Sequence, residues 1–192
     1  MSPRLVVYGS LADAWITLWL VWIVMSFHVK WTLKRQSARS RAGQTVMISF
    51  AYILVFADTF AGGPLAQRLV PAQPAWRILG VALTYAGIAF AIWARIVLGR
   101  NWSSNVTLKE NHSFVRSGPY ALVRHPIYSG LLLAMLGTAL VAAEAHAFLG
   151  VAVAFVAWRL KFLEEERFMI EQFGLEYEEY RRRTPALVPF IL

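Results

Sequence analysis

Two stretches of the sequence gather the residues whose chemistry stands out from a largely apolar chain. The first, residues 101–130, reads NWSSNVTLKENHSFVRSGPYALVRHPIYSG. Its tetrapeptide SGPY at 117–120 predicts a turn, and His125-Pro126 predicts a helix start, because proline fits a first helical position. The plainer interpretation is a loop before a helix, with Arg124 and His125 bound to lipid headgroups. Ionisable residues at the end of a membrane helix are costly, however, and usually have partners.

The second stretch, residues 158–180, reads WRLKFLEEERFMIEQFGLEYEEY. Glu164, Glu165 and Glu166 follow an apolar segment directly, and at 3.6 residues per turn three successive carboxylates cannot share one helix face. At least one of them should point inward. Lys161 lies four residues before Glu165, on the same face of a helix. The plainer interpretation is a solvated acidic turn that ends a membrane span.

The elements that position these stretches are predicted to be membrane helices. The 192 residues are 58% hydrophobic and 16% charged, with a mean hydropathy of +0.50, which is too apolar for an ordinary soluble domain. A bilayer core about 30 Å thick needs roughly 20 apolar residues in a helix. We therefore expect an all-α, polytopic membrane protein with about five transmembrane helices. The predicted spans are residues 11–29, 46–60, 76–98, 127–143 and 145–162, the last two forming a tight antiparallel hairpin.

Charge predicts the orientation. Basic residues concentrate in loop 30–41, in loop 99–125 and in the tail, and they are scarce in the alternate loops. The positive-inside rule then puts the C-terminus in the cytoplasm and the N-terminus outside. The net charge of +8 fits anionic membrane lipids better than nucleic acid, because the basic residues flank apolar runs. The first apolar run is too long for a signal peptide and has no small-residue cleavage pattern, so we expect it to be retained.

Several kinds of site are excluded or not favoured by composition. The chain has no cysteine, which excludes disulfides, thiolate metal sites and a cysteine nucleophile. The four histidines make no metal-ligand spacing on one helix, so we expect no metal site. No glycine-rich turn follows a strand, so we do not expect a cofactor site on a doubly wound sheet.

Taken together, the two stretches resemble the isoprenylcysteine carboxyl methyltransferase family of integral membrane methyltransferases. The matching residues are His112, Phe114 and Val115; Ser117, Gly118, Pro119 and Tyr120; Val123, Arg124, His125, Pro126, Ile127 and Tyr128; Glu165 and Glu166; Phe173, Gly174, Tyr177 and Tyr180. The end of the chain, RRRTPALVPF, also looks like the C-terminal segment of that family. The resemblance covers about residues 99–190, and the first two predicted spans carry no matching motif.

The resemblance implies an all-helical fold whose C-terminal half encloses S-adenosylmethionine in a pocket facing the cytoplasm. Residues 1–75 would supply the N-terminal transmembrane helices, and residues 76–192 the remaining helices with the catalytic region, in one integrated domain. The residues that match the cofactor-contacting motif are His112, Ser113, Phe114, Val115, Tyr120, Arg124, His125, Pro126, Tyr128 and Glu165.

The same resemblance implies catalytic roles for Arg124, Glu165 and Lys161. The arginine before the His-Pro pair is associated with the methyl-accepting carboxylate, and Arg124 can hold a carboxylate through two parallel hydrogen bonds. Glu165 can bind the amino group or the ribose hydroxyls of the cofactor. The family has a substrate-binding arginine where this chain has Lys161, a departure that leaves the acceptor open between a prenylated carboxylate and another lipophilic molecule.

Two other functions stay open on the sequence alone. The membrane sterol reductases share a similar C-terminal architecture but bind NADPH. A non-catalytic membrane protein that binds lipid headgroups or a partner would show the same polar loop. Cofactor titration separates the three: S-adenosylhomocysteine binding supports the methyltransferase, NADPH binding the reductase, and neither supports the non-catalytic protein.

Overall fold

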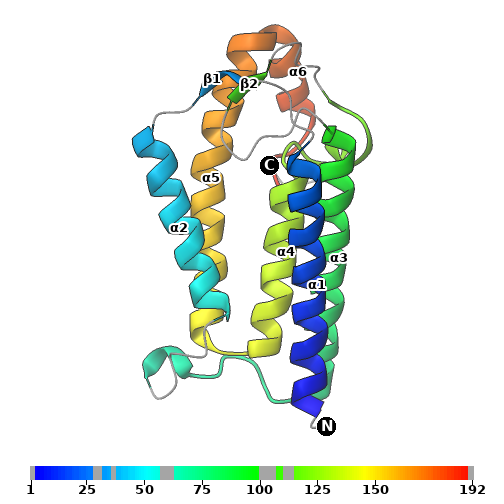
Figure 1. Cartoon of the computed structure of the whole chain (residues 1–192), viewed down its shortest axis with the longest axis vertical. Coiled ribbons are helices and arrows are strands. Elements are labelled where there is room, and N and C mark those ends of the chain that lie inside the picture. Colours follow the sequence, from blue (N-terminus) through cyan, green and yellow to red (C-terminus); the bar gives the residue numbers. More distant parts are fainter. Residues whose placement is uncertain are drawn as a thin grey trace.

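The computed structural model of the chain describes residues 3–27, 32–35, 38–56, 63–99, 107–109 and 115–189, with side chains described within 11–27, 40–56, 63–99 and 115–189. These residues form an elongated bundle in which the long helices run along one axis (Figure 1). The helices are α1 (Pro3–Ser26), α2 (Ala38–Phe56), α3 (Pro74–Leu98), α4 (Pro126–Ala142), α5 (Ala145–Phe173) and α6 (Leu175–Arg183), with short 3-10 helices η2 (Pro64–Ala66) and η4 (Gly118–Ala121).

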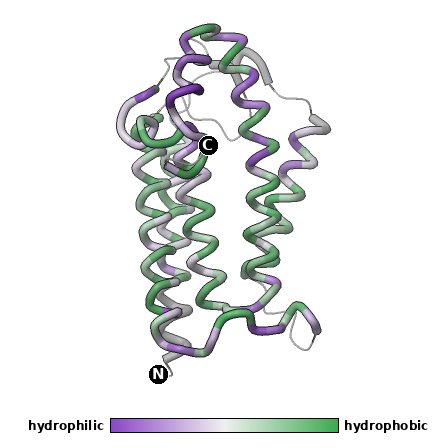
Figure 2. Tube along the Cα trace, turned by 180° about the vertical axis from the view of Figure 1, so that it is seen from behind, coloured by the Kyte–Doolittle hydropathy of each residue, from purple (hydrophilic) through white to green (hydrophobic). Residues whose placement is uncertain are grey.

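The predicted helical class is confirmed, and each predicted span lies largely within one of the five long helices. Helices α3 and α5 are long and apolar enough to cross a membrane, whereas residues 11–26 and α4 are apolar but shorter. Figure 2 shows apolar residues along the helix shafts and polar residues gathered toward the two ends. The number of spans and the orientation stay predictions.

Helix α5 extends beyond the predicted span, which ends at residue 162. It continues to Phe173, because residues 163–173 contain mostly good helix formers and no glycine or proline. Gly174 then ends the helix with a positive φ of 54°, a conformation that glycine adopts without strain. The three consecutive glutamates therefore lie inside a helix, as the comparison of their helix faces assumed, and not in a turn that ends the span.

Helices α3 and α4 pack in close contact through two pairs of facing glycines. A Cβ added at Gly87 would lie 2.4 Å from the carbonyl oxygen of Gly130, and one added at Gly137 would lie 2.4 Å from that of Gly80. Small residues let membrane helices approach this closely. The contact fixes α4, and with it the polar residues at the start of α4, against α3.

The end of the bundle opposite the polar residues is closed by backbone hydrogen bonds. Only Ala143 and Glu144 separate α4 from α5, as the predicted hairpin requires, and Ala143 has a positive φ of 63°. The loop after η2 pairs with this turn, since the Leu69 amide donates to the Ala143 carbonyl and the Ala145 amide donates to the Gln67 carbonyl, over 2.8 and 2.9 Å.

A small two-stranded sheet joins two loops at the other end of the bundle, and the sequence did not predict it. Strand β1 (Thr32–Arg35) lies after α1, and strand β2 (Thr107–Lys109) lies between α3 and η4. They pair antiparallel, with Arg35 opposite Thr107. Both basic loops therefore meet at the end of the bundle where α4 begins (Figure 1).

Candidate active site

The first polar group of the site is positioned by the turn that leads into α4. Gly118 has a φ of 60° and begins η4, which confirms the predicted turn. His125 then caps α4 and Pro126 occupies its first turn, as expected for proline at a helix start. Arg124, His125 and Tyr128 are thereby presented from one end of α4.

The three successive glutamates of α5 point to three different sets of partners, as the helical repeat requires. Glu164 accepts hydrogen bonds from Ser40 and Gln44 of α2, over 3.0 and 3.3 Å. Glu165 and Glu166 instead face the start of α4. Glu166 is the buried member of the set, with 4% of its surface exposed.

Glu166 joins the two charged or chargeable residues that precede α4. Its Oε1 accepts a hydrogen bond from Nε of Arg124 over 2.8 Å and lies 3.0 Å from Nε2 of His125. The guanidinium of Arg124 also donates from Nη1 to the backbone carbonyls of Arg181 and Thr184. The Nη2 of Arg124 has no hydrogen-bond partner among the residues that the structure describes.

Glu165 forms the second half of the site with Tyr128. The Tyr128 hydroxyl donates to Oε1 of Glu165 over 2.6 Å. The other oxygen, Oε2, lies 3.7 Å from Nδ1 of His125, which is too long for a hydrogen bond. Within the described part of the chain, this oxygen accepts no hydrogen bond, and the Glu165 side chain is 24% exposed.

Aromatic rings line the same space. The His125 ring stacks on Phe162 with centroids 4.6 Å apart, and the Tyr128 ring stacks on Trp158 with centroids 5.9 Å apart. The ammonium group of Lys161 lies 5.7 Å from the centre of the Tyr128 ring, within cation–π range. The site is therefore a set of hydrogen-bonding groups between flat apolar walls.

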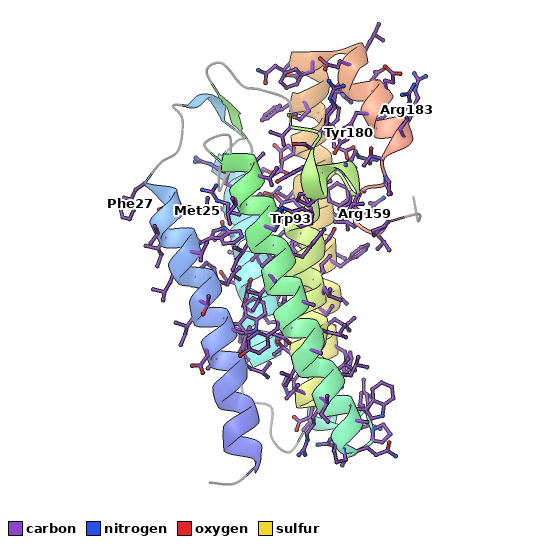
Figure 3. All side chains as sticks on the ribbon, turned by 90° about the vertical axis from the view of Figure 1, so that its right-hand side faces the viewer. Met25, Phe27, Trp93, Arg159, Tyr180 and Arg183 are labelled. Atoms are coloured by element: carbon purple, nitrogen blue, oxygen red, sulfur yellow. The ribbon has the colours of Figure 1, made fainter. Side chains whose placement is uncertain are left out.

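The C-terminal segment packs against the start of α4 and is hydrogen-bonded to it. Helix α6 turns back from the end of α5 (Figure 1), and Tyr180 and Arg183 lie at that end of the molecule (Figure 3). The Arg124 and His125 amides donate to the carbonyls of Pro185 and Ala186 over 2.8 and 3.0 Å. These bonds fix the backbone that carries both side chains.

Two tyrosines of α6 stay protonated in this setting. Burial raises the pKa of Tyr180 to about 12, and burial also raises the pKa of Tyr177. The Tyr180 hydroxyl donates to the Tyr120 carbonyl over 2.6 Å, which ties α6 to η4. The Tyr180 hydroxyl is therefore a hydrogen-bond donor, and neither hydroxyl acts as a base.

The structure brings most of the predicted site residues together and leaves some undescribed. His112, Ser113 and Phe114 lie outside the described residues. Val115 packs with Tyr120 in a small apolar cluster beside α4. The described residues contain no group of three or more histidines, aspartates and glutamates placed to hold a metal ion.

Trp158 and Phe162 were not singled out from the sequence, and Glu166 was matched to the family motif without a role in the site. Trp158, Phe162 and Glu166 are spaced four residues apart on α5, so they share one face of the helix. That spacing is visible in the sequence. It becomes informative once α5 is known to continue past residue 162, because only then does Glu166 fall on the face of Trp158.

The chain is similar to a methyltransferase family and to several individual proteins. A family model described as "Phospholipid methyltransferase" matches residues 75–176. Protein-S-isoprenylcysteine O-methyltransferase B of Arabidopsis thaliana is 33% identical over 118 residues, which are 58% of this chain and 58% of that protein. A probable protein-S-isoprenylcysteine O-methyltransferase of Oryza sativa subsp. indica is 28% identical over 161 residues, 80% of this chain and 83% of that protein.

A third relative carries a different name. The cobalt-zinc-cadmium resistance protein CzcN of Cupriavidus metallidurans is 36% identical over 94 residues, which are 48% of this chain and 43% of that protein. The chain thus spans between about two fifths and four fifths of the length of these relatives. The family match over residues 75–176 includes the start of α4 and the polar face of α5.

Proposed function

We propose that this chain, which belongs to the phospholipid methyltransferase family by its match over residues 75–176, transfers a methyl group from S-adenosylmethionine to the carboxylate of a lipophilic molecule. The observation that carries the proposal is the cluster of Arg124, His125, Tyr128 and Glu165 at one end of a bundle of apolar helices. A membrane protein of this family with such a cluster can take its acceptor from the bilayer.

The residues present fit a cationic cofactor. Oε2 of Glu165 accepts no hydrogen bond from the described residues and faces His125 at 3.7 Å, so it can receive a donor such as the cofactor's amino group or a ribose hydroxyl. Tyr120, Tyr128 and Pro126 would complete the cofactor site with apolar surface. His112, Ser113, Phe114 and Val115 belong to the same proposed site through the family resemblance.

For methyl transfer, the main task of the protein is to align the cofactor and the acceptor. Bound S-adenosylmethionine supplies a methyl group already activated by its sulfonium, so a single displacement by a carboxylate oxygen requires neither a metal nor a covalent enzyme intermediate. The protein must orient the acceptor and exclude water. The buried rings of Trp158 and Phe162 and the closely packed start of α4 serve the second task.

Arg124 is the proposed partner of the acceptor carboxylate. It is permanently charged, and its Nη2 makes no hydrogen bond within the described residues. Nε and Nη1 already donate hydrogen bonds to protein acceptors, so Nη2 can bind the acceptor carboxylate without rearrangement. A pair of hydrogen bonds from Nη1 and Nη2 to the carboxylate would require Nη1 to give up a bond to a backbone carbonyl. Lys161, close to the Tyr128 ring, would add a second positive charge.

Two of the relatives described above are named for isoprenylcysteine, which makes a prenylated carboxylate the first acceptor to try. The chain has Lys161 where the family resemblance leads one to expect an arginine, and one relative is named for metal resistance. We therefore propose the wider class, a carboxylate on a lipophilic body, rather than prenylated proteins alone.

The protein is proposed to cross the membrane several times, with the site at the cytoplasmic face. The basic loops and the polar cluster share one end of the bundle, which supports this orientation under the positive-inside rule. An apolar acceptor tail could then stay in hydrocarbon while its carboxylate reaches Arg124.

The test is cofactor binding by the purified, detergent-solubilised protein. We expect saturable binding of S-adenosylhomocysteine and none of NADPH, followed by transfer of labelled methyl groups to a lipophilic carboxylate in an acceptor screen. Binding of NADPH alone would identify a reductase. Binding of neither would leave a non-catalytic membrane protein.

A further inference from the structure

We propose that Glu166 is a positioning residue that holds the Arg124 side chain and fixes the ring proton of His125 on Nε2. The consequence for turnover rests on the function proposed above, but the position of the proton does not. Glu166 would touch neither cofactor nor acceptor, and it would act entirely through its two neighbours.

The first step of the argument is the sharing of one oxygen. Oε1 of Glu166 lies 2.8 Å from Nε of Arg124 and 3.0 Å from Nε2 of His125. A carboxylate beside a guanidinium is ionised, and an ionised carboxylate can only accept hydrogen bonds. A hydrogen bond at 3.0 Å therefore requires that Nε2 of His125 carries a proton.

The second step concerns the other ring nitrogen. With a proton on Nε2, a neutral imidazole has a lone pair on Nδ1. That nitrogen lies 3.7 Å from Oε2 of Glu165, so two hydrogen-bond acceptors face each other across a gap, with no donor from the described residues between them. The gap can receive a hydrogen-bond donor from a ligand, and it loses this property if the proton moves to Nδ1.

The third step compares the neighbours of His125: Oε2 of Glu165 lies 3.7 Å from Nδ1, beyond hydrogen-bond range, and the remaining contacts apart from that with Glu166 do not distinguish the two ring nitrogens. The carbonyl of Ala186 binds the His125 amide, and Phe162 stacks on the ring at 4.6 Å. These contacts fix the backbone and the plane of the ring, whichever nitrogen is protonated. Glu166, with 6% of its side chain exposed, is the neighbour that distinguishes one tautomer from the other.

The direct experiment is nuclear magnetic resonance of the full chain labelled with 15N-histidine, in detergent micelles at neutral pH and without cofactor. The His125 signals are assigned by their loss in His125→Gln. The pH is raised from neutral until the ring carries a single proton, and we expect that proton on Nε2. A single proton on Nδ1 overturns the proposal in the wild-type protein alone, so a variant that fails to fold does not leave it untested.

The matched variants are Glu166→Gln and Glu164→Gln. In Glu166→Gln the amide no longer supplies a charge at Nε2, and the proton should move to Nδ1, because the nearest carboxylate oxygen to the ring is then Oε2 of Glu165, 3.7 Å from Nδ1. Turnover should fall by about tenfold or more, the scale known for residues that orient metal-bound histidines. Glu164→Gln keeps its partners Ser40 and Gln44 and should leave both the tautomer and turnover unchanged.

Two outcomes of the variant experiment overturn the proposal: an unchanged Nε2 proton in Glu166→Gln, or full turnover by that variant in an active enzyme. Failure of the proposed function is distinguishable from both. A wild-type protein that carries the Nε2 proton but binds no S-adenosylhomocysteine would refute the methyltransferase and leave the role of Glu166 in setting the tautomer intact.

Discussion

Glu165 is the carboxylate whose loss should affect cofactor binding most. Glu165→Ala removes an oxygen that accepts no hydrogen bond from the described residues, together with the partner of the Tyr128 hydroxyl. Loss of a charge-assisted hydrogen bond costs about 1.5–3 kcal/mol, or about ten- to a hundredfold in affinity. Titration calorimetry with S-adenosylhomocysteine measures it. Glu171→Ala, an exposed position on the same helix, is the control and should bind normally.

His125→Ala should weaken cofactor binding to a similar extent. It removes Nδ1, which together with Oε2 of Glu165 borders the gap proposed to receive a hydrogen-bond donor of the cofactor. Both variants should still fold, since the start of α4 keeps its backbone bonds to the C-terminal segment. If both variants bind S-adenosylhomocysteine with wild-type affinity, the cofactor site lies elsewhere.

Arg124→Lys tests whether this residue serves the acceptor more than the cofactor. Lysine keeps the charge but loses the planar fork, so it cannot reproduce the bonds to Glu166 and to the backbone carbonyls of Arg181 and Thr184. We expect a large fall in turnover with cofactor affinity changed only a few-fold. Loss of cofactor binding with unchanged acceptor affinity would assign Arg124 to the cofactor instead.

Lys161→Arg is the conservative counterpart and should be tolerated. The guanidinium restores the residue that the family resemblance leads one to expect, and it stacks on an aromatic ring at least as well as an ammonium does. Turnover within about threefold of wild type, under assay conditions that resolve the Arg124→Lys defect, is the expected result. A loss comparable to that of Arg124→Lys would mean that the shape of the Lys161 ammonium is specifically required.

At this scale the sequence predicted residue types better than it predicted their partners. Arg124, His125 and Tyr128 were identified, and the structure brings them together. The family resemblance assigned a cofactor role to Glu165, but helical periodicity alone could not tell which glutamate is buried, because a helix turns by about 100° per residue and the inward face depends on where α4 lies. The position of α4 is part of the tertiary structure, and it determines that Glu166 is the buried carboxylate.

Among the elements, the α3–α4 contact should be the most sensitive to added volume. In Gly87→Ala the new methyl would meet the Gly130 carbonyl at 2.4 Å and the Ala134 amide at 2.5 Å, and both are backbone atoms that cannot rotate away. Overpacking of this kind costs about 1–3 kcal/mol. Unfolding in mixed micelles, followed by circular dichroism, should show Gly87→Ala less stable than wild type by that amount.

Gly43→Ala is the matched control for that substitution. Gly43 lies in α2 and has nothing within 4 Å of an added Cβ, so alanine should stabilise the helix by up to about 1 kcal/mol through its higher propensity. Equal effects of the two substitutions would contradict the close contact between α3 and α4.

The sequence indicated some of the contacts between helices and strands but not others. Gly80 and Gly87 are spaced seven residues apart, as are Gly130 and Gly137, so each pair lies on one helix face and indicates a close helix contact. The sequence prediction instead emphasised the α4–α5 hairpin, which the short connection at Glu144 requires. Nothing local indicates that strands β1 and β2 pair, because the partners lie on loops far apart in the chain.

For the whole molecule, the central question is how many of its helices cross the membrane. Helices α3 and α5 meet the length and hydropathy that a span requires, whereas α4 has 17 residues. At 1.5 Å per residue α4 is about 25 Å long, at the lower limit for a bilayer core of about 30 Å. The turn between α4 and α5 is hydrogen-bonded to the loop before α3. This turn and this loop therefore lie on the same side of the membrane, which requires α4 to cross if α3 does.

The topology prediction therefore rests on α4. Between Gln73 and the C-terminus the chain contains α3, α4 and α5, and three crossings put these two points on opposite sides of the membrane, whatever α1 and α2 do. Two crossings would put them on the same side. Reporter fusions at Gln73 and after Leu192 should report outside and cytoplasm, respectively, and a third insertion at Glu144 should agree with Gln73, because Ala145 and Gln67 share a backbone hydrogen bond. A cytoplasmic signal at both Gln73 and Leu192 would mean that α4 does not cross, and the polar cluster would then need a different route to its lipophilic acceptor.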